Sequence, residues 1–320
     1  MKRYTVLSTS PTFTKYSHKA AQILEESNCR LVMIPPSEMH QREDFKTVLA
    51  EADAWVVGIN KVLAADLEQA PRLKVIVKHG TGIDSIDLAA AARRGIIVAN
   101  APGTNASAVA DLAMGLIIAG ARQIVAADQK TRQGFWGPVM GYDVFGKTLG
   151  VLGLGKIGRG VIQRALGFAM NILGYDVVHD EEFEKEYRVR PASLKEILSA
   201  ADFITIHLPL TPETRHIIGA CELEQMKPTS FLINTCRGGV VDETALYDAL
   251  SQKKIAGAAL DVYQVEPPLS SALLKLDNVI LTPHMGGYTY GAMALTSEVV
   301  AQSVVNVLQG KPPLYEVKIN

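Results

Sequence analysis

The sequence predicts an α/β fold made of doubly wound parallel sheets. Short apolar segments recur along the chain, and most of them precede a segment whose apolar residues have helical spacing. Turns rich in glycine and proline separate these segments, and polar residues follow several of the apolar ones. The chain has 320 residues, of which 48% are hydrophobic and 20% are charged, and this favours a large core and about two domains.

Residues 1–100 are expected to form most of the first domain. The last helix, over 292–309, should return to it because the two ends of a domain often lie close together. One domain would then comprise residues 1–100 and 288–320, and the other residues 101–287. The strands expected in the first domain cover 4–8, 30–34, 54–57, 73–78 and 96–99, and the helices cover 17–27, 41–51 and 64–70.

The segment 107–122 predicts a long helix that is apolar on all sides. It follows a break rich in proline and glycine, and Asn105 or Ser107 can cap it. Such a helix must be buried on several sides, so it is either an interior helix or one shared between domains or subunits. Residues 123–146 follow as a glycine-rich arm with little periodicity, which would cover a site, lie at a subunit boundary or simply connect the domains.

A glycine pattern opens the second domain. An apolar run ends in Gly153-x-Gly155-x-x-Gly158, a helical stretch follows, and a second apolar run ends in Asp176. Gly153 would allow a sharp turn, Gly155 would let the backbone approach a pyrophosphate, and Gly158 would let the helix pack tightly on the sheet. An isolated match can be an ordinary tight turn between a strand and a helix. The flanking runs and the acidic end instead favour a dinucleotide-binding unit.

Asp176 indicates which dinucleotide binds. It lies 18 positions after Gly158, near the spacing expected for a carboxylate that accepts hydrogen bonds from ribose hydroxyls. A 2′-phosphate would be repelled there, and the next residues, Val177, Val178 and His179, include no arginine to receive one. NAD is therefore favoured over NADP.

The remaining segments of the second domain place polar residues at the ends of strands. Strands are expected over 203–207, 230–234, 257–261 and 279–282, with a helix after the loop 211–216 and another over 242–251 that Asp242 caps. Open α/β sheets bind ligands beyond the carboxyl ends of their strands. The polar residues expected at these ends are Asp176, His207, Arg237, Asp261 and His284.

Composition excludes several other classes of function. The formal net charge is −1 with both signs interspersed, so nothing predicts a nucleic-acid or membrane-surface partner. Cys29, Cys221 and Cys236 are widely spaced and predict neither a disulfide framework nor a metal site. The first residues lack the apolar core of a signal peptide, so a cytoplasmic location is expected.

Arg237, Glu266 and His284 are the residues best suited to chemistry. A guanidinium binds the carboxylate of a 2-oxo acid in bidentate fashion and polarises the adjacent carbonyl. A histidine can exchange a proton near neutral pH, and a glutamate can set its tautomer and favour its charged form. Taken singly, His284 could be a satisfied loop histidine, Glu266 a solvated turn residue and Arg237 a surface residue.

The chain resembles the D-isomer-specific 2-hydroxyacid dehydrogenase family, and within it most of all the phosphoglycerate dehydrogenases. The segments that carry the resemblance run in family order from about residue 70 to 290. They are Lys78–Asp87, 95–103, 146–158, 207–211, 234–243, 257–263, Glu266-Pro-Pro268 and Pro283-His284.

The resemblance implies two Rossmann-like domains with a cleft between them, NAD as cofactor, and usually a homodimer formed through the helix and arm at 105–146. It implies that Arg237 binds the substrate carboxylate and carbonyl and that His284 and Glu266 form the acid/base pair. The residues implied in cofactor binding are Thr81, Gly153, Gly155, Lys156, Ile157, Gly158, Asp176, His207, Thr235, Cys236 and Asp261. Those implied in substrate binding are Lys78, His79, Gly80, Thr81 and Arg237.

Two departures from the phosphoglycerate dehydrogenases bear on the substrate. Gly58 stands where these enzymes typically carry an arginine for the anionic groups of the substrate, and Lys78 stands in place of a second arginine. The loss of a bidentate cation favours an unphosphorylated 2-oxo acid such as glyoxylate or hydroxypyruvate. Formate dehydrogenases are disfavoured because they carry glutamine where Glu266 stands. The remaining alternative is a non-enzymatic, NAD-sensing interaction protein of the corepressor type on the same scaffold.

Overall fold

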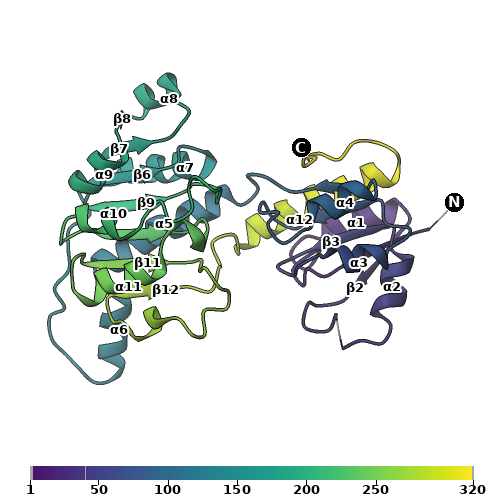
Figure 1. Cartoon of the computed structure of the whole chain (residues 1–320), viewed down its shortest axis with the longest axis horizontal. Helices are drawn as coiled ribbons and strands as arrows, with labels where there is room; N and C mark the ends of the chain where they lie inside the picture. Colours follow the sequence, from purple (N-terminus) through teal and green to yellow (C-terminus); the bar gives the residue numbers. More distant parts are fainter. Residues whose placement is uncertain (1–2, 40, 319–320) are drawn as a thin grey trace. The chain divides into compact units, whose positions relative to one another are not determined.

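The computed structural model describes residues 3–39 and 41–318, which form two compact units (Figure 1). Unit 1 contains the described residues up to Asn105 and those from Gly287 onward, and unit 2 is Ala106–Gly286. The linking segment 101–105 was expected in the second domain but belongs to unit 1. Backbone and side-chain bonds hold it there, since the Ala101 N–H donates to Gly80 O and Thr104 Oγ1 lies 2.8 Å from Thr296 Oγ1.

Unit 1 is a doubly wound parallel sheet with the strand order β2-β1-β3-β4-β5. Helices α1 and α12 cover one face, and α2, α3 and α4 cover the other; each face has its own apolar core. The strands are β1 (Tyr4–Ser8), β2 (Cys29–Met33), β3 (Ala54–Val57), β4 (Val75–Lys78) and β5 (Ile97–Ala99). The helices are α1 (His18–Glu26), α2 (Phe45–Glu51), α3 (Ala64–Glu68), α4 (Leu88–Arg93) and α12 (Tyr290–Leu308).

Helix α12 brings the C-terminal part of the chain back to unit 1. By length and composition α12 could cross a membrane, but 61% of its most apolar window is buried inside the protein. Val300, Ala301 and Val304 lie in the same core as residues of β1 and α1. This burial is what the core helix of a globular unit shows.

Unit 2 is a doubly wound parallel sheet of seven strands in the order β12-β11-β10-β9-β6-β7-β8. The order reverses between β6 and β9, and such a switch point is where open α/β sheets bind ligands. The strands are β6 (Thr148–Leu152), β7 (Asn171–Tyr175), β8 (Val189–Pro191), β9 (Phe203–Ile206), β10 (Phe231–Asn234), β11 (Gly257–Leu260) and β12 (Val279–Leu281). The helices are α5 (Ala106–Ala121), α6 (Ile124–Arg132), α7 (Lys156–Ala165), α8 (Glu181–Glu186), α9 (Leu194–Ala200), α10 (Ala220–Gln225) and α11 (Glu243–Ser251).

The sequence predicted most of these elements and missed a few. Helix α5 lies against the core beneath β6 and β10 and buries nine of its residues there. Helix α6, by contrast, was expected as an irregular arm, because it buries no residue and therefore shows no apolar stripe. Helices α4, α8 and α9 and strand β8 were also not predicted; they are short, with seven residues or fewer.

Candidate active site

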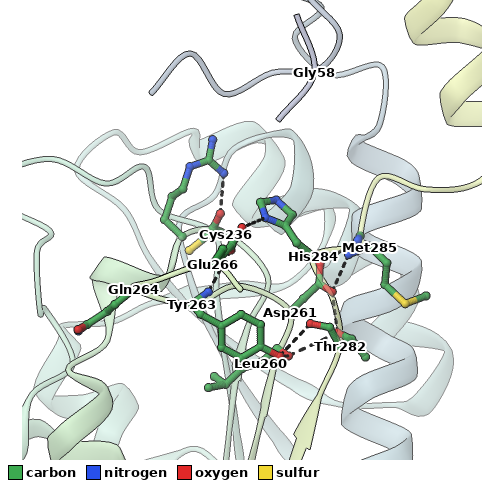
Figure 2. A network of polar contacts seen from close by, with 12 residues as sticks. Gly58, Cys236, Leu260, Asp261, Tyr263, Gln264, Glu266, Thr282, His284 and Met285 are labelled. Carbon is green, nitrogen blue, oxygen red and sulfur yellow. Dashed lines mark hydrogen bonds and ion pairs between the residues drawn. The ribbon is translucent and has the colours of Figure 1, made fainter. Parts of the chain in front are cut away.

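The carboxyl ends of β10, β11 and β12 carry three of the polar residues singled out in the sequence. These strands are neighbours in the parallel sheet of unit 2, so their carboxyl ends meet at one edge. Arg237, Asp261 and His284 follow them, and Glu266 lies in the loop after β11. Figure 2 shows Glu266 hydrogen-bonded to His284, and Asp261 hydrogen-bonded to residues on either side of His284.

His284 and Glu266 form a hydrogen-bonded pair. His284 Nδ1 lies 2.7 Å from Glu266 Oε2, and the Tyr263 N–H donates to Glu266 Oε1 at 3.1 Å, so both carboxylate oxygens are held (Figure 2). The Nδ1–H is then the proton shared with the carboxylate, which leaves Nε2 on the opposite edge of the ring.

The electrostatic environment keeps Glu266 ionised. Burial by itself would raise the pKa of its carboxyl group, but the hydrogen bond and charge of His284, the Tyr263 N–H and the charge of Arg237 together lower the pKa below its usual value. The pair therefore combines a fixed carboxylate with an imidazole that it orients, which is the arrangement general acid–base catalysis requires.

Asp261 holds the turn that carries His284. Its Oδ1 accepts hydrogen bonds from Thr282 Oγ1 at 2.6 Å and from the Met285 N–H at 2.9 Å, and its Oδ2 accepts one from the Gly286 N–H at 2.8 Å. Asp261 is 1% exposed. These bonds fix the backbone around His284, whose φ of 53° is in the left-handed region. This positioning contact was not anticipated, because the three donors are separated from Asp261 by a whole strand.

Arg237 lies near the His284–Glu266 pair, since its charge contributes to the lowered pKa of Glu266. Its Nη1 donates to Cys236 O at 2.7 Å, and Asn234 Nδ2 donates to Arg237 O at 2.9 Å. The next residue must be glycine, since a Cβ at Gly238 would lie 1.9 Å from the carbonyl carbon of Tyr263. This close approach packs the Arg237 segment against the segment that leads to Glu266. Burial raises the pKa of the Cys236 thiol to about 11, so Cys236 is not a reactive thiolate.

The glycine pattern has the geometry of a phosphate cradle. Gly153 has a φ of +98°, and a Cβ there would lie 2.7 Å from His207 O. A Cβ at Gly158 would lie 2.0 Å from Gly153 O, whereas one at Gly155 would meet open space. Helix α7 begins directly afterward with Lys156 and Ile157, so its free N–H groups and positive dipole end lie at the turn.

Asp176, at the end of β7, lies against the same turn. Its Oδ2 accepts a hydrogen bond from the Leu154 N–H at 2.6 Å, and its Oδ1 accepts one from the Val178 N–H at 3.0 Å. The carboxylate is therefore fixed beside the glycine turn, where a ribose joined to a pyrophosphate in the turn would reach it.

Two buried polar atoms fit a bound polar ligand. In the part of the chain that the structure describes, Thr235 Oγ1 and His207 Nδ1 are buried without a hydrogen-bond partner. They follow the neighbouring strands β10 and β9. Burial lowers the pKa of His207 to about 3, so its ring is neutral. Buried polar atoms are nearly always satisfied, so these two fit a cofactor that supplies the missing partners.

The residues at 78–81 belong to unit 1. Lys78 Nζ donates to Gly58 O at 2.5 Å and to Ser85 Oγ at 3.0 Å. The His79 ring is buried, and the Gly80 N–H donates to Lys78 O.

Within residues 3–39 and 41–318, no group of three or more histidine, cysteine or acidic side chains is placed to hold a metal ion.

Comparisons with known proteins assign the chain to a family. The model of the D-isomer specific 2-hydroxyacid dehydrogenase, NAD binding domain, matches residues 114–286. A D-3-phosphoglycerate dehydrogenase from Methanocaldococcus jannaschii is 44% identical over 274 residues, which are 84% of this chain and 52% of the relative, so the chain spans about half the length of that protein. A glyoxylate reductase from Korarchaeum cryptofilum is 42% identical over 287 residues, which are 87% of this chain and 85% of the relative.

Solved structures agree with this assignment. The D-lactate dehydrogenase from Aquifex aeolicus, complexed with NAD and lactic acid, superposes with a TM-score of 0.79 at 29% identity and covers 96% of each chain. The family model, the two relatives and the Aquifex aeolicus structure show that the chain is an enzyme of the D-isomer-specific 2-hydroxyacid dehydrogenase family and that its cofactor is NAD.

Proposed function

We propose that this protein interconverts a small D-2-hydroxy acid and its 2-oxo acid with NAD. The observation that carries the proposal is the His284–Glu266 pair, which lies with Arg237 at the carboxyl edge of β10, β11 and β12. An oriented histidine and a guanidinium at a ligand-binding edge are the groups that reduction of a 2-oxo acid requires.

In the direction of reduction, Arg237 binds the carboxylate and polarises the carbonyl, and His284 gives its Nε2 proton to the carbonyl oxygen. Glu266 keeps the proton on Nδ1 and stabilises the charged ring before transfer. When bound, NADH supplies the hydride. Asp261 keeps the His284 turn in place, so the ring does not have to be ordered anew in each turnover.

The cofactor would lie along the carboxyl edge of unit 2. Backbone groups of the glycine turn and of the start of α7 would bind the pyrophosphate, and Asp176 would accept from the ribose hydroxyls. The unsatisfied atoms of Thr235 and His207 would receive polar groups of the nucleotide. The proposed cofactor contacts in unit 2 are the residues at 153–158, Asp176, His207, Thr235, Cys236 and Asp261.

Unit 1 favours an unphosphorylated substrate. A side chain at Gly58 would meet the Cα of Ser10 at 3.1 Å, and the Lys78 ammonium is engaged by Gly58 O and Ser85 Oγ. A second anionic group of a substrate would therefore meet no bidentate cation from either position. The curated relatives carry both names, phosphoglycerate dehydrogenase and glyoxylate reductase. We favour glyoxylate, hydroxypyruvate or a similar small acid.

A homodimer through residues 105–146 belongs to the same proposal. Trp136, Met140 and Phe145 are 92%, 81% and 74% exposed in the arm, and an apolar surface of this kind is typical of a protein interface. The cytoplasmic location remains a prediction from the sequence.

The decisive variants are His284→Ala and Arg237→Ala. The first should lower kcat at least about a hundredfold while the dissociation constant for NADH, measured by fluorescence, stays within about twofold. The second should mainly raise KM for the 2-oxo acid. Equal loss of NADH binding and turnover in His284→Ala would refute the acid–base role.

The corepressor-type alternative finds no support, since the relatives described above are named as dehydrogenases or reductases.

A further inference from the structure

An arginine from helix α7 reaches the loop that follows β7. Arg159 Nε donates to Leu154 O at 2.8 Å, and Arg159 Nη1 lies 2.7 Å from Asp180 Oδ2. The guanidinium carbon also lies 4.4 Å from the centre of the Phe183 ring, so the group rests on the face of a buried aromatic side chain. Arg159 is thus held at three points beside the glycine turn.

Arg159 lies next to the proposed ribose site. The Leu154 N–H donates to Asp176 Oδ2 at 2.6 Å, whereas Leu154 O accepts from Arg159. Leu154, in the glycine turn, therefore has the Asp176 carboxylate on its N–H and the Arg159 guanidinium on its carbonyl. Residues 177–179 contain no arginine that could receive a 2′-phosphate, but the fold brings one to this loop from α7.

Asp180 is fixed through both of its carboxylate oxygens. Its Oδ2 binds Arg159, and its Oδ1 accepts from the Phe183 N–H at 3.1 Å, which caps helix α8. The hydrogen bond from the Phe183 N–H, followed by that from Arg159, lowers the pKa of Asp180 below its usual value, so the carboxylate is charged at neutral pH. Asp180 therefore neutralises Arg159 from a position that the start of α8 defines.

These contacts decide what a phosphorylated ribose would meet. An arginine near the end of this strand is the group that accommodates a 2′-phosphate in NADP-binding sheets, since a guanidinium binds phosphate in bidentate fashion. A phosphate at Asp176 would here meet that carboxylate and a guanidinium already bound by Asp180. The His179 ring is also engaged, because its Nδ1 lies 3.0 Å from Glu184 Oε1. The loop therefore suits a ribose hydroxyl and disfavours a phosphate.

We propose that Asp180 is a specificity-determining residue that withholds Arg159 from the 2′-phosphate of NADP. Asp176 repels the phosphate, and Asp180 binds the cation that would otherwise receive it. The preference for NAD then depends on two carboxylates, one of which does not touch the cofactor. This inference rests on the proposed function, which places the ribose at Asp176.

The test is a double-mutant cycle between Asp180 and Arg159, read by the dissociation constants of NADH and NADPH. Binding is followed by nicotinamide fluorescence in the absence of substrate. Asp180→Asn keeps an oxygen that can cap α8 and removes the charge that holds Arg159. The side chains of Arg159 and Asp180 are 37% and 41% exposed. The NADPH dissociation constant should fall about fivefold, the largest factor expected for an exposed ion pair, while the NADH constant stays within about twofold.

Two comparisons isolate the released arginine. In the wild-type background, Arg159→Gln should change NADPH affinity less than about twofold, since Asp180 already occupies the guanidinium. In the Asp180→Asn background the same substitution should cancel the gain. Glu181→Gln is the matched control, because it removes one exposed negative charge from the start of α8 and leaves Asp180 in place. It should leave NADPH affinity within about twofold of the wild-type value.

Wild-type NADPH affinity in Asp180→Asn would overturn the proposal. So would a gain that Glu181→Gln shares, or one that persists in the double variant Asp180→Asn/Arg159→Gln. If Asp180→Asn does not fold, Asp180→Ser, which also caps helices, carries the cycle. Tight NADH binding without turnover of any 2-oxo acid would refute the proposed function, and the cycle would still decide the role of Asp180.

Discussion

Replacing Glu266 with glutamine removes one charge from the His284 pair and leaves its shape intact. A carboxamide oxygen can still accept from His284 Nδ1 or from the Tyr263 N–H, the two contacts that the carboxylate makes at 2.7 Å and 3.1 Å. The variant therefore isolates the electrostatic contribution of Glu266 from its role in orienting the ring. We expect the oriented ring to persist and its protonated form to be less stable.

The size of the effect follows from the exposure of the pair. A hydrogen bond to a charged partner contributes about 1.5–3 kcal/mol, and the side chains of His284 and Glu266 are 47% and 39% exposed, so water screens their attraction and the lower end applies. A loss of about 1.5 kcal/mol corresponds to roughly a tenfold lower kcat. KM for the 2-oxo acid and the dissociation constant for NADH should change less than about twofold.

The assay is steady-state NADH oxidation with saturating 2-oxo acid. Glu243→Gln is the matched control, because Glu243 lies in the same region, accepts from the Gln264 N–H and is not part of the proposed site. A kcat for Glu266→Gln that equals the wild-type value, or that falls no further than in Glu243→Gln, would refute the electrostatic reasoning.

Three other outcomes are expected. Arg237→Lys should raise KM for the 2-oxo acid at least about tenfold in initial-rate kinetics, because an ammonium cannot bind the carboxylate in bidentate fashion; wild-type KM would remove Arg237 from the substrate site. Asp176→Ala should lower the ratio of kcat/KM with NAD to kcat/KM with NADP about tenfold. An unchanged ratio would mean that another group distinguishes the ribose hydroxyl from a 2′-phosphate. Burial, reinforced by the charge of Lys78, lowers the pKa of His79 from 6.5 to about 4. The unfolded chain then binds more protons between these pH values, and stability falls as the pH drops from 6.5 toward 4. The cost at about pH 5 is about 2 kcal/mol. The urea midpoint of wild type should therefore fall more than that of His79→Leu between about pH 8 and about pH 5; equal shifts would contradict the burial of a neutral ring.

The parts of the fold that the sequence predicted are those with local signals. The glycine turn is such a case, since the close approaches at Gly153 and Gly158 are dictated within one strand, one turn and one helix. Asp242 caps α11 as predicted, and α12 returns to unit 1. The acidic α8 and the exposed α6 were missed because neither has an apolar stripe long enough to produce a periodic signal.

The candidate site was only partly predictable. Parallel strands bring their carboxyl ends to one edge, so the approach of Arg237, Asp261 and His284 followed from the order of strand-like segments. The contacts that hold Asp261 and the His284 turn could not be anticipated, because the three donors to Asp261 lie beyond a further strand and only the folded chain brings them to it. The same is true in unit 1 of the hydroxyl groups of Ser10 and Ser297, which bind the two ring nitrogens of His79. A buried histidine and an exposed one look alike in a sequence, and only packing shows which nitrogen has a partner.

The most direct test of the central claim is NADH oxidation by the purified protein with a panel of 2-oxo acids. The panel contains glyoxylate, hydroxypyruvate, pyruvate and phosphohydroxypyruvate, and kcat/KM is measured for each at fixed saturating NADH. We predict turnover with a D-2-hydroxy acid as product and a higher kcat/KM for an unphosphorylated acid than for phosphohydroxypyruvate, since Gly58 and Lys78 offer no bidentate cation. Tight NADH binding without oxidation by any member of the panel would contradict the claim.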